Sequence, residues 1–328
     1  MKETILNIGI IGTGKHGSRY AAHIINDVSK MRLAAISRRN ETGREQARQW
    51  NCVWHREWEA LVADPAVDAI ISAVPPALNR RIAEACSASE KPLLMEKPLS
   101  VTAADARAIV SMFRERGVPL TVGQTLRYNP VIQGLREHFS LLGECWSFVV
   151  NQRLEPSTLL WLEDPEQAGA GVILHTAVHL FDALRFITGI EIVRVRAMSR
   201  RIYNPHLEDL LLAQVECRKG VTGLVDTSKI SPARTGRFEF MGRNGILWGD
   251  QIYGHLEWLQ GTESTPLACS PPGPTIVNLL EDWYNFLIGT GENPVDGAEG
   301  LAAVEACDAC LRSVSSGGWE YVGQSSEK

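Results

Sequence analysis

The sequence predicts an α/β protein with two domains. The first 123 residues alternate short apolar runs with segments of helical period, which is typical of a parallel sheet covered by helices. Beyond a long apolar helical segment, the second half is rich in strand-like runs separated by short polar turns, which predicts an antiparallel or mixed sheet. A chain of 328 residues is long enough for two domains that each bury a core.

The first domain is predicted from repeated strand and helix signals. Short apolar runs predict strands at residues 5–11, 33–37, 69–74, 93–95 and 120–123. Apolar residues at helical spacing predict helices near residues 15–28, 41–50, 78–88 and 102–116. The pattern changes after these elements, so we place a domain boundary after residue 124, giving domains at residues 1–124 and 125–328.

The second domain begins with a helix near residues 130–141, a strand at 145–153 and a loop rich in acidic residues and glycine. A long, mostly apolar helix is predicted near residues 171–188. Strands follow at residues 190–203, 207–217, 221–228, 237–241 and 252–258, and two helices near 275–288 and 297–315 complete the domain.

Composition and charge exclude several classes of protein. Hydrophobic residues make up 45% and charged residues 22% of the chain, which is typical of a globular protein and argues against disorder. The net charge of −5 comes with no basic block, so we expect no nucleic-acid partner. The sequence shows neither a secretory leader nor a membrane-spanning apolar run, so we expect a cytoplasmic protein without a membrane partner.

The cysteine pattern fits the same compartment. Seven cysteines, an odd number scattered through a long chain, indicate reduced thiols and not a disulfide framework. Cys307 and Cys310 form a CxxC, but they lie in a predicted helix and no second pair completes a zinc site. We therefore expect two cysteines packed in a core.

A glycine motif assigns a ligand to the first domain. Gly12-Thr13-Gly14-Lys15-His16-Gly17 is a GxGxxG that follows the first predicted strand and opens the first predicted helix. In this context the first glycine permits the tight turn, the second lets a diphosphate approach the backbone, and the third lets the helix pack closely. The motif predicts a Rossmann domain that binds a dinucleotide.

The end of the second predicted strand bears on which dinucleotide binds. NAD-specific sites carry Asp or Glu about 20 residues after the motif, where the carboxylate holds the ribose 2′-hydroxyl. This chain has Ser37, Arg38 and Arg39 instead. Hydroxyl and guanidinium donors suit a 2′-phosphate, so we predict NADP as the cofactor. Stacking of Arg38 on adenine, or simple solvation of its guanidinium, leaves NAD as the alternative.

Several later motifs carry a family resemblance. Val74-Pro75 follows the predicted strand at residues 69–74, Glu96-Lys97-Pro98 follows the strand at 93–95, and Arg127-Tyr128-Asn129-Pro130 follows the strand at 120–123. Gly169-Ala170-Gly171 and His179-Leu180-Phe181-Asp182 come later. With the glycine motif, these segments resemble the Gfo/Idh/MocA family of nicotinamide-dependent sugar and polyol oxidoreductases through essentially the whole chain.

The resemblance implies a fold and a role for each domain. It implies a Rossmann domain at residues 1–124 that binds the dinucleotide, with Val74, Pro75, Asn79, Glu96 and Lys97 joining the glycine motif around the cofactor. It also implies a substrate-binding and oligomerisation domain at 125–328, with a large open, mainly antiparallel sheet. A homodimer or homotetramer and a small-molecule substrate are then expected.

Lys97 has a functional position on chemical grounds as well. It follows a parallel strand, at the edge where open α/β sheets bind their ligands. An ammonium there donates to a substrate oxygen and stabilises the negative charge that develops during hydride transfer. The resemblance implies that the Lys97–Pro98 peptide is often cis.

The predicted helix at residues 171–188 carries a polar stripe. At 100° per residue, His175, His179 and Asp182 fall on one face, and Gly171 lies one turn earlier, where a ligand could approach. The resemblance makes His179 the candidate acid/base, which suits an imidazole. Without the resemblance, a core histidine with satisfied hydrogen bonds is the more common reading of such a residue.

Two positions depart from the family pattern. His175 stands where an acidic residue, most often Asp, is usual, so the orientation of His179 or the binding of a substrate hydroxyl is in doubt. An unusual substrate, such as an acidic one, or reduced activity would follow. Asn79 stands where many members carry His, but its amide can still bind a ribose.

The leading mechanism is reversible hydride transfer between the nicotinamide and a carbinol carbon. Lys97 polarises the oxygen, His179 moves the proton, and Arg127, Tyr128, Trp161 and His175 contact the substrate; packing of Trp161 against the sheet is the alternative for that residue. Two other functions remain open. One is a cofactor-binding regulator with little turnover, and the other is a metal enzyme using the i, i+4 pair His175 and His179, although we expect no metal.

Overall fold

The computed structural model describes residues 4–323 and divides into two compact units. Within the described residues, unit 1 comprises 4–100, 104–124 and 274–301, and unit 2 comprises 101–103, 125–273 and 302–323. Residues 274–301, which the sequence analysis places in the second domain, pack with unit 1.

Unit 1 contains a six-stranded sheet, here called sheet A, with every neighbouring pair parallel. Its order, β3-β2-β1-β4-β5-β6, is that of a Rossmann domain and confirms the predicted class. The order reverses between β1 and β4, and such a switch point is where this fold binds its ligand. The strands are β1 (Leu6–Ile11), β2 (Met31–Ser37), β3 (Val53–His55), β4 (Ala69–Ser72), β5 (Leu93–Glu96) and β6 (Leu120–Gly123).

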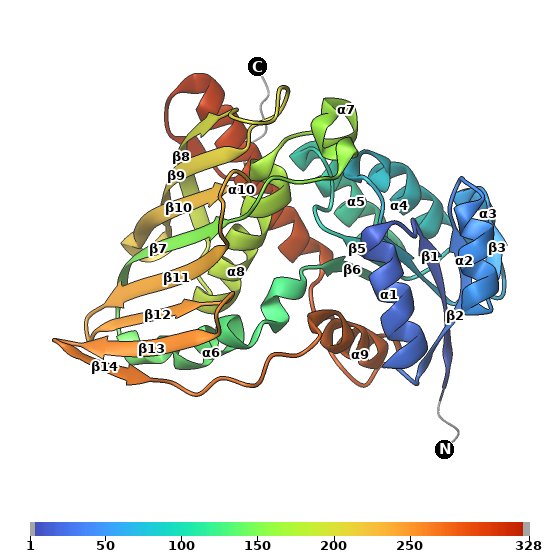
Figure 1. Cartoon of the computed structure of the whole chain (residues 1–328), viewed down its shortest axis with the longest axis horizontal. Coiled ribbons are helices and arrows are strands. Elements are labelled where there is room, and N and C mark those ends of the chain that lie inside the picture. Colours follow the sequence, from blue (N-terminus) through green and yellow to red (C-terminus); the bar gives the residue numbers. More distant parts are fainter. Residues whose placement is uncertain (1–3, 324–328) are drawn as a thin grey trace. The chain divides into compact units, whose positions relative to one another are not determined.

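Helices connect the strands of sheet A, and α1 and α9 pack against each other (Figure 1). The central strands β4 and β5 are buried along their whole length and mostly apolar because helices cover both faces of a parallel sheet. The helical segments are α1 (Lys15–Asn26), α2 (Thr42–Trp50), α3 (Trp58–Val62), η1 (Pro76–Leu78), α4 (Asn79–Ala88), α5 (Ala103–Arg116) and α9 (Thr275–Leu287). The prediction omitted β3 and α3, which are too short to show a period.

Unit 2 contains a nine-stranded sheet, here called sheet B, in which only β7 and β10 pair in parallel among the described strands. This confirms the predicted large, mainly antiparallel sheet. Its strands are β7 (Cys145–Arg153), β8 (Ile192–Arg200), β9 (Leu210–Cys217), β10 (Thr222–Ser228), β11 (Thr235–Gly242), β12 (Ile246–Asp250), β13 (His255–Gln260), β14 (Glu263–Pro266) and β15 (Glu320–Tyr321). The prediction omitted β12, β14 and β15, and it began β13 too early because residues 251–254 form a turn.

One face of sheet B packs on helices and forms the core of unit 2 (Figure 1). The helical segments are η2 (Thr125–Tyr128), α6 (Pro130–His138), η3 (Phe139–Leu142), η4 (Leu160–Glu163), α7 (Pro165–Ala168), η5 (Ile173–Ala177), α8 (Val178–Thr188), η6 (Arg218–Gly220) and α10 (Gly297–Ser316), whose first residues belong to unit 1. Side chains of sheet B alternate between buried and exposed, as expected for an antiparallel sheet with one covered face.

The helix expected at residues 171–188 is not a regular α-helix throughout. Residues 173–177 form a π-helical turn, η5, which continues directly into α8. The segment 165–188 is apolar and long enough to cross a membrane, but 83% of its most apolar window is buried within the structure. It is therefore accounted for as a core helix of unit 2.

The cysteines pack as the sequence predicted. Cys307 and Cys310 are fully buried on α10 within the core of unit 2. All seven cysteines are free thiols, and the described residues contain no group of three or more His, Cys, Asp or Glu side chains suited to a metal ion.

Candidate active site

The glycine motif forms the turn between β1 and α1, and its glycines serve different purposes. Gly12 has a φ of +87°, and a Cβ there would lie 2.6 Å from the Val74 side chain. A Cβ on Gly17 would lie 2.0 Å from the Gly12 carbonyl oxygen. A Cβ on Gly14, at the N-terminus of α1, would meet nothing within 4 Å. The turn thus leaves open space where the helix N-terminus favours an anion.

Arg38 is held against this turn. Its Nη1 donates to the Thr13 carbonyl oxygen at 2.7 Å and to Gln46 Oε1 at 3.2 Å. Gln46 also accepts from the Thr13 hydroxyl at 2.7 Å, and its amide donates to the Thr13 carbonyl and to Ser18. Both hydrogen bonds of Arg38 use one nitrogen, and a guanidinium has further N–H groups with which to bind an anion.

Basic side chains surround the end of β2. Trp54 Nε1 donates to the Arg38 carbonyl oxygen, and the Arg44 guanidinium stacks on the Trp54 ring at 4.8 Å. Arg39 is exposed, and Arg56 donates to its carbonyl oxygen. Ser37 is buried, and its carbonyl oxygen accepts from the Gly12 amide at 3.0 Å. No carboxylate occupies positions 37–39, where an NAD-specific site would have one.

Glu96, at the end of β5, is buried and bonded to two residues of α1. Its Oε1 accepts from the Tyr20 hydroxyl at 2.6 Å and lies 3.1 Å from His16 Nε2. Burial by itself raises the pKa of Glu96, but the hydrogen bonds from His16 and Tyr20 and the charges of His16 and Lys97 outweigh it and hold the pKa below its ordinary value. Burial and the neighbouring Glu96 carboxylate raise the pKa of Tyr20 well above its ordinary value.

Lys97 follows Glu96 at the carboxyl end of β5 and is half-buried. The Lys97–Pro98 peptide is cis, as the resemblance implied. Asn79 is buried, and its Nδ2 donates to the carbonyl oxygens of Pro98 at 3.0 Å and Leu99 at 3.3 Å. Asn79 therefore holds the segment that follows Lys97.

The polar residues of the helix in unit 2 are placed differently from the prediction. His175 lies in the π-helical turn η5, so the spacing of 100° per residue does not apply between it and α8. His175 is buried, its Nε2 bonds the Ala168 carbonyl oxygen at 2.9 Å, and the Trp161 ring meets it edge-on at 5.3 Å. His179 is half-buried near the start of α8.

Gly171 lets two parts of the chain pack closely. A Cβ there would lie 1.9 Å from the Glu208 carbonyl oxygen, so the missing side chain makes room for the chain itself. Glu208 also accepts from the Ile173 amide at 3.0 Å through Oε1, and its carbonyl oxygen accepts from the Val172 amide. Glu208, two residues before β9, thus caps the start of the helix.

Arg127 and Asp182 form a buried ion pair. Arg127 Nε and Nη2 donate to the two carboxylate oxygens of Asp182 at 2.9 and 2.6 Å. The side chains of Arg127 and Asp182 are 9% and 0% exposed. Asp182 was expected on the polar stripe with His175 and His179, and Arg127 was expected to contact substrate. In the structure these two side chains bind each other.

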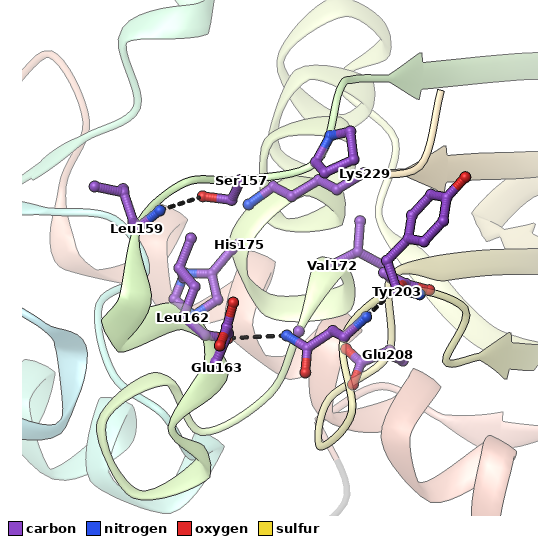
Figure 2. Close-up of a pocket in the computed structure, with 13 residues that line it drawn as sticks. Ser157, Leu159, Leu162, Glu163, Val172, His175, Tyr203, Glu208 and Lys229 are labelled. Atoms are coloured by element: carbon purple, nitrogen blue, oxygen red, sulfur yellow. Dashed lines mark hydrogen bonds between the residues drawn. The ribbon is translucent and has the colours of Figure 1, made fainter. Parts of the chain in front are cut away.

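A cavity of about 130 Å³ adjoins His175 in unit 2 (Figure 2). Lys229 extends its side chain toward the loop that carries Ser157 (Figure 2). The carboxylate of Asp209 accepts from the amides of residues 202, 203 and 204 and so organises one wall. The lining residues are Pro156, Ser157, Leu159, Leu162, Glu163, Gly171, Val172, His175, Tyr203, Asn204, Glu208, Asp209 and Lys229.

Several of these residues were missed by the sequence analysis. Tyr20 lies four residues after His16 on α1, and this helical spacing was the available signal. Gln46, Glu208 and Lys229 have no motif, and only the folded chain brings them to Arg38, to η5 and to the cavity beside His175. Tyr128 lies half-buried in η2, next to Arg127.

Known proteins resemble this chain in sequence and in fold. The family description "Oxidoreductase family, NAD-binding Rossmann fold" matches residues 6–124, and the "GFO/IDH/MocA C-terminal domain" matches residues 142–248. Inositol 2-dehydrogenase 1 of Saccharopolyspora erythraea is 30% identical over 74% of this chain and 73% of that protein. The scyllo-inositol 2-dehydrogenase (NAD(+)) of Bacillus subtilis is 24% identical over 73% of this chain and 72% of that protein.

Among solved structures, a levoglucosan dehydrogenase in complex with NADH and levoglucosan aligns with a TM-score of 0.88. The alignment covers 98% of this chain and 100% of that one at 20% identity, which supports the fold. The comparisons support an oxidoreductase and favour neither the regulator nor the metal enzyme. With both family domains matched in order, the chain belongs to the Gfo/Idh/MocA family of NAD(P)-dependent oxidoreductases.

Proposed function

We propose that this protein is an NADP(H)-preferring dehydrogenase or reductase that acts on a ring hydroxyl, or the matching carbonyl, of a cyclic polyol or sugar. The observation that carries the proposal is Lys97, which stands at the carboxyl end of β5 in a Rossmann domain that belongs to this family. The inositol dehydrogenases and the levoglucosan dehydrogenase among its relatives support the substrate class.

The glycine turn fits a dinucleotide. Open space at Gly14 and the N-terminus of α1 suit a diphosphate, with Thr13, Lys15 and His16 in the same turn. Ser37, Arg38 and Arg39, without a carboxylate, suit a 2′-phosphate. The Val74 side chain borders the turn, and Pro75 follows it in the sequence. The bound cofactor supplies or accepts the hydride. We assign the cofactor to the domain at residues 1–124, and the substrate and oligomer contacts to the domain at 125–328.

Each remaining candidate has a role within this proposal. Lys97 donates to the substrate oxygen and stabilises its developing charge, and His179 exchanges the proton. His175, which lines the cavity in unit 2, binds the substrate together with Trp161, whose ring meets it edge-on, and with Tyr128. Arg127 donates two hydrogen bonds to Asp182, so we propose that it positions α8.

We also propose a homodimer or homotetramer in the cytoplasm. Exposed apolar side chains on sheet B, including Val149 at 43% and Leu224 at 49% exposure, support self-association. The seven free thiols, four of them buried, support a reducing compartment.

Cofactor titration tests the proposal directly. Quenching of the nine tryptophans measures the Kd for NADPH and for NADH. We expect tighter binding of NADPH, and in Arg38→Ala a loss of about 10- to 100-fold in NADPH affinity, the effect of losing hydrogen bonds to a charged group, with little change for NADH. Arg48→Ala, an exposed arginine on α2, is the matched control.

A substrate screen follows with the preferred cofactor. Inositols, levoglucosan and related sugars are tested for oxidation, and the corresponding ketones are tested for reduction. Absorbance at the nicotinamide band records turnover. Turnover that is abolished in Lys97→Met supports the assignment. Preference for NADH overturns the role of Arg38, and cofactor binding without turnover across the panel overturns the enzymatic proposal.

A further inference from the structure

One side chain joins the phosphate-binding turn of unit 1 to the strand that carries Lys97. Glu96 is the residue before Lys97, and its Oε1 accepts from Tyr20 at 2.6 Å and lies 3.1 Å from His16 Nε2. His16 belongs to the glycine motif, and Tyr20 lies one turn later on α1. The rings of His16 and Tyr20 meet edge-on at 6.0 Å, so both donors approach the carboxylate from one helix.

The surroundings of Glu96 fix its side chain. Glu96 is 7% exposed, and Tyr20 is fully buried. A Cβ on Gly123, the neighbour of Glu96 on β6, would lie 2.9 Å from Glu96 Oε1 and 3.2 Å from the Tyr20 hydroxyl. The glycine thus leaves the room that this hydrogen-bonded pair fills, and the carboxylate has little freedom to reorient.

Lys97 is held on both sides. Before it, the Glu96 backbone pairs with Gly123 in sheet A, and the Glu96 side chain is bonded to α1. After it, Asn79 donates to the Pro98 and Leu99 carbonyl oxygens. The positive charge of Lys97 acts on the Glu96 carboxylate and helps to keep it ionised.

We propose that His16 and Tyr20 are positioning residues that act through Glu96 on Lys97 and so link the phosphate-binding turn to the catalytic lysine. This inference rests on the proposed catalytic role of Lys97. Two donors on one buried oxygen fix the carboxylate beside Lys97, and a lysine with a restricted orientation reaches the substrate oxygen at less entropic cost. Both donors lie on α1, whose N-terminus would face the diphosphate, so the same helix would bind the cofactor and hold the carboxylate that precedes Lys97.

The competing role is direct contact between His16 and the cofactor, as the motif by itself suggests. Tyr20 separates the two roles because it is fully buried and its hydroxyl bonds Glu96, the residue before Lys97. Loss of its hydroxyl therefore changes positioning without removing a cofactor contact. His23 is a matched control because it lies on the same helix and its Nδ1 bonds the Asp27 carboxylate at 2.6 Å. This pair is separate from the cluster of His16, Tyr20 and Glu96.

The experiment compares Tyr20→Phe, His16→Gln, His16→Ala and His23→Ala in the full chain, with NADPH and the substrate that wild type turns over fastest. We expect kcat at saturating cofactor to fall about tenfold in Tyr20→Phe and His16→Ala, the effect of one lost hydrogen bond to a charged group. The Kd for NADPH should stay within about twofold, and His16→Gln, which keeps a donor, should recover part of kcat. His23→Ala should match wild type.

A second readout does not depend on turnover. Lysines carrying 13C-methyl groups give resolved NMR signals, and Lys97→Arg identifies the signal of Lys97. We expect this signal to shift in Tyr20→Phe and His16→Ala and to stay in place in His23→Ala, because only the first two change the carboxylate beside Lys97.

The outcomes separate the two roles. The inference is overturned if the Kd for NADPH rises in the His16 variants while Tyr20→Phe keeps wild-type kcat and an unmoved Lys97 signal. His16 is then a cofactor contact. Full activity in Lys97→Met overturns the proposed function instead, and the NMR signal then decides whether His16 and Tyr20 position Lys97. Reduced kcat with unchanged Kd in Tyr20→Phe supports the inference.

Discussion

At the scale of single residues, the glycines of the turn after β1 meet two different demands. Gly17 makes room for the chain, because a Cβ there would lie 2.0 Å from the Gly12 carbonyl oxygen. Gly14 leaves space for a ligand, because a Cβ there would meet nothing within 4 Å. The same substitution at the two positions should therefore affect different properties.

We expect Gly17→Ala to lower the free energy of unfolding by about 1–3 kcal/mol, the range for overpacking, as measured by urea denaturation. Gly14 has a φ of −73°, which alanine adopts, so Gly14→Ala should leave stability unchanged or raise it by about 0.4–1 kcal/mol. Its Cβ should nevertheless weaken NADPH binding at least about tenfold, measured by tryptophan quenching, by filling the space for the diphosphate. Unchanged NADPH affinity in Gly14→Ala would place the diphosphate elsewhere.

At the scale of elements, a buried ion pair fastens η2 to α8. Asp182→Asn removes the carboxylate charge that balances the buried Arg127 guanidinium in the core of unit 2, so we expect a loss of about 3–5 kcal/mol in the free energy of unfolding. Replacing both residues, as Arg127→Met with Asp182→Leu, should cost less than Asp182→Asn alone because no charge remains buried. Urea denaturation measures wild type and both variants, and a loss below about 1 kcal/mol in Asp182→Asn would show that the pair is dispensable.

The start of the helix that contains η5 depends on Glu208, whose pKa is perturbed. Burial raises the pKa of Glu208 above its ordinary value of 4.5, although amide hydrogen bonds from Ile173 and Gly171 oppose the shift. A carboxyl group with a higher pKa in the folded state binds its proton more tightly there than in the unfolded chain. Its contribution to stability is therefore largest below pH 4.5 and is lost as the pH rises from 4.5 through the higher folded pKa.

Glu208→Gln removes this titration. We expect the unfolding free energy of wild type, relative to Glu208→Gln, to fall as the pH rises through that window and to level off above it. Urea denaturation at a series of pH values measures the difference. Parallel curves for the two proteins would show that the Glu208 pKa is the same in the folded and unfolded states.

At the scale of the whole molecule, sheet B presents one exposed face with apolar neighbours on adjacent strands. Val149 pairs with Leu224 across β7 and β10, and Met198 pairs with Leu212 across β8 and β9. All four are at least 41% exposed, which favours burial against a second copy of the chain.

We expect wild type to sediment as a dimer or tetramer of 36.2 kDa subunits. The double variant Leu224→Glu with Met198→Glu should shift the equilibrium toward the monomer. Exposed substitutions change stability by only about 0.5 kcal/mol, so the variant should remain folded. Glu137→Lys, an exposed change on α6, serves as the control. A monomeric wild type, or an oligomer that the double variant leaves intact, would assign this face to another use.

The sequence by itself determined the order and type of the main elements, because buried parallel strands and amphipathic helices leave periodic signals over many residues. The β6 and β7 bounds are identical in prediction and structure, whereas the short β3, α3 and β14 left too little signal. Motifs also identified the glycine turn, Lys97 and the family, since these depend on local residue type and spacing.

Only the tertiary structure decided which partner each polar side chain takes. Arg127 meets Asp182, Glu96 meets Tyr20, and Glu208 caps η5 across 55, 76 and 35 residues of sequence respectively. It also decided that Gly171 packs against Glu208 and that His175 lies in a π-helical turn. The physical reason is that a buried polar group takes the partner that packing brings within hydrogen-bond distance, and no local pattern in the sequence records that distance.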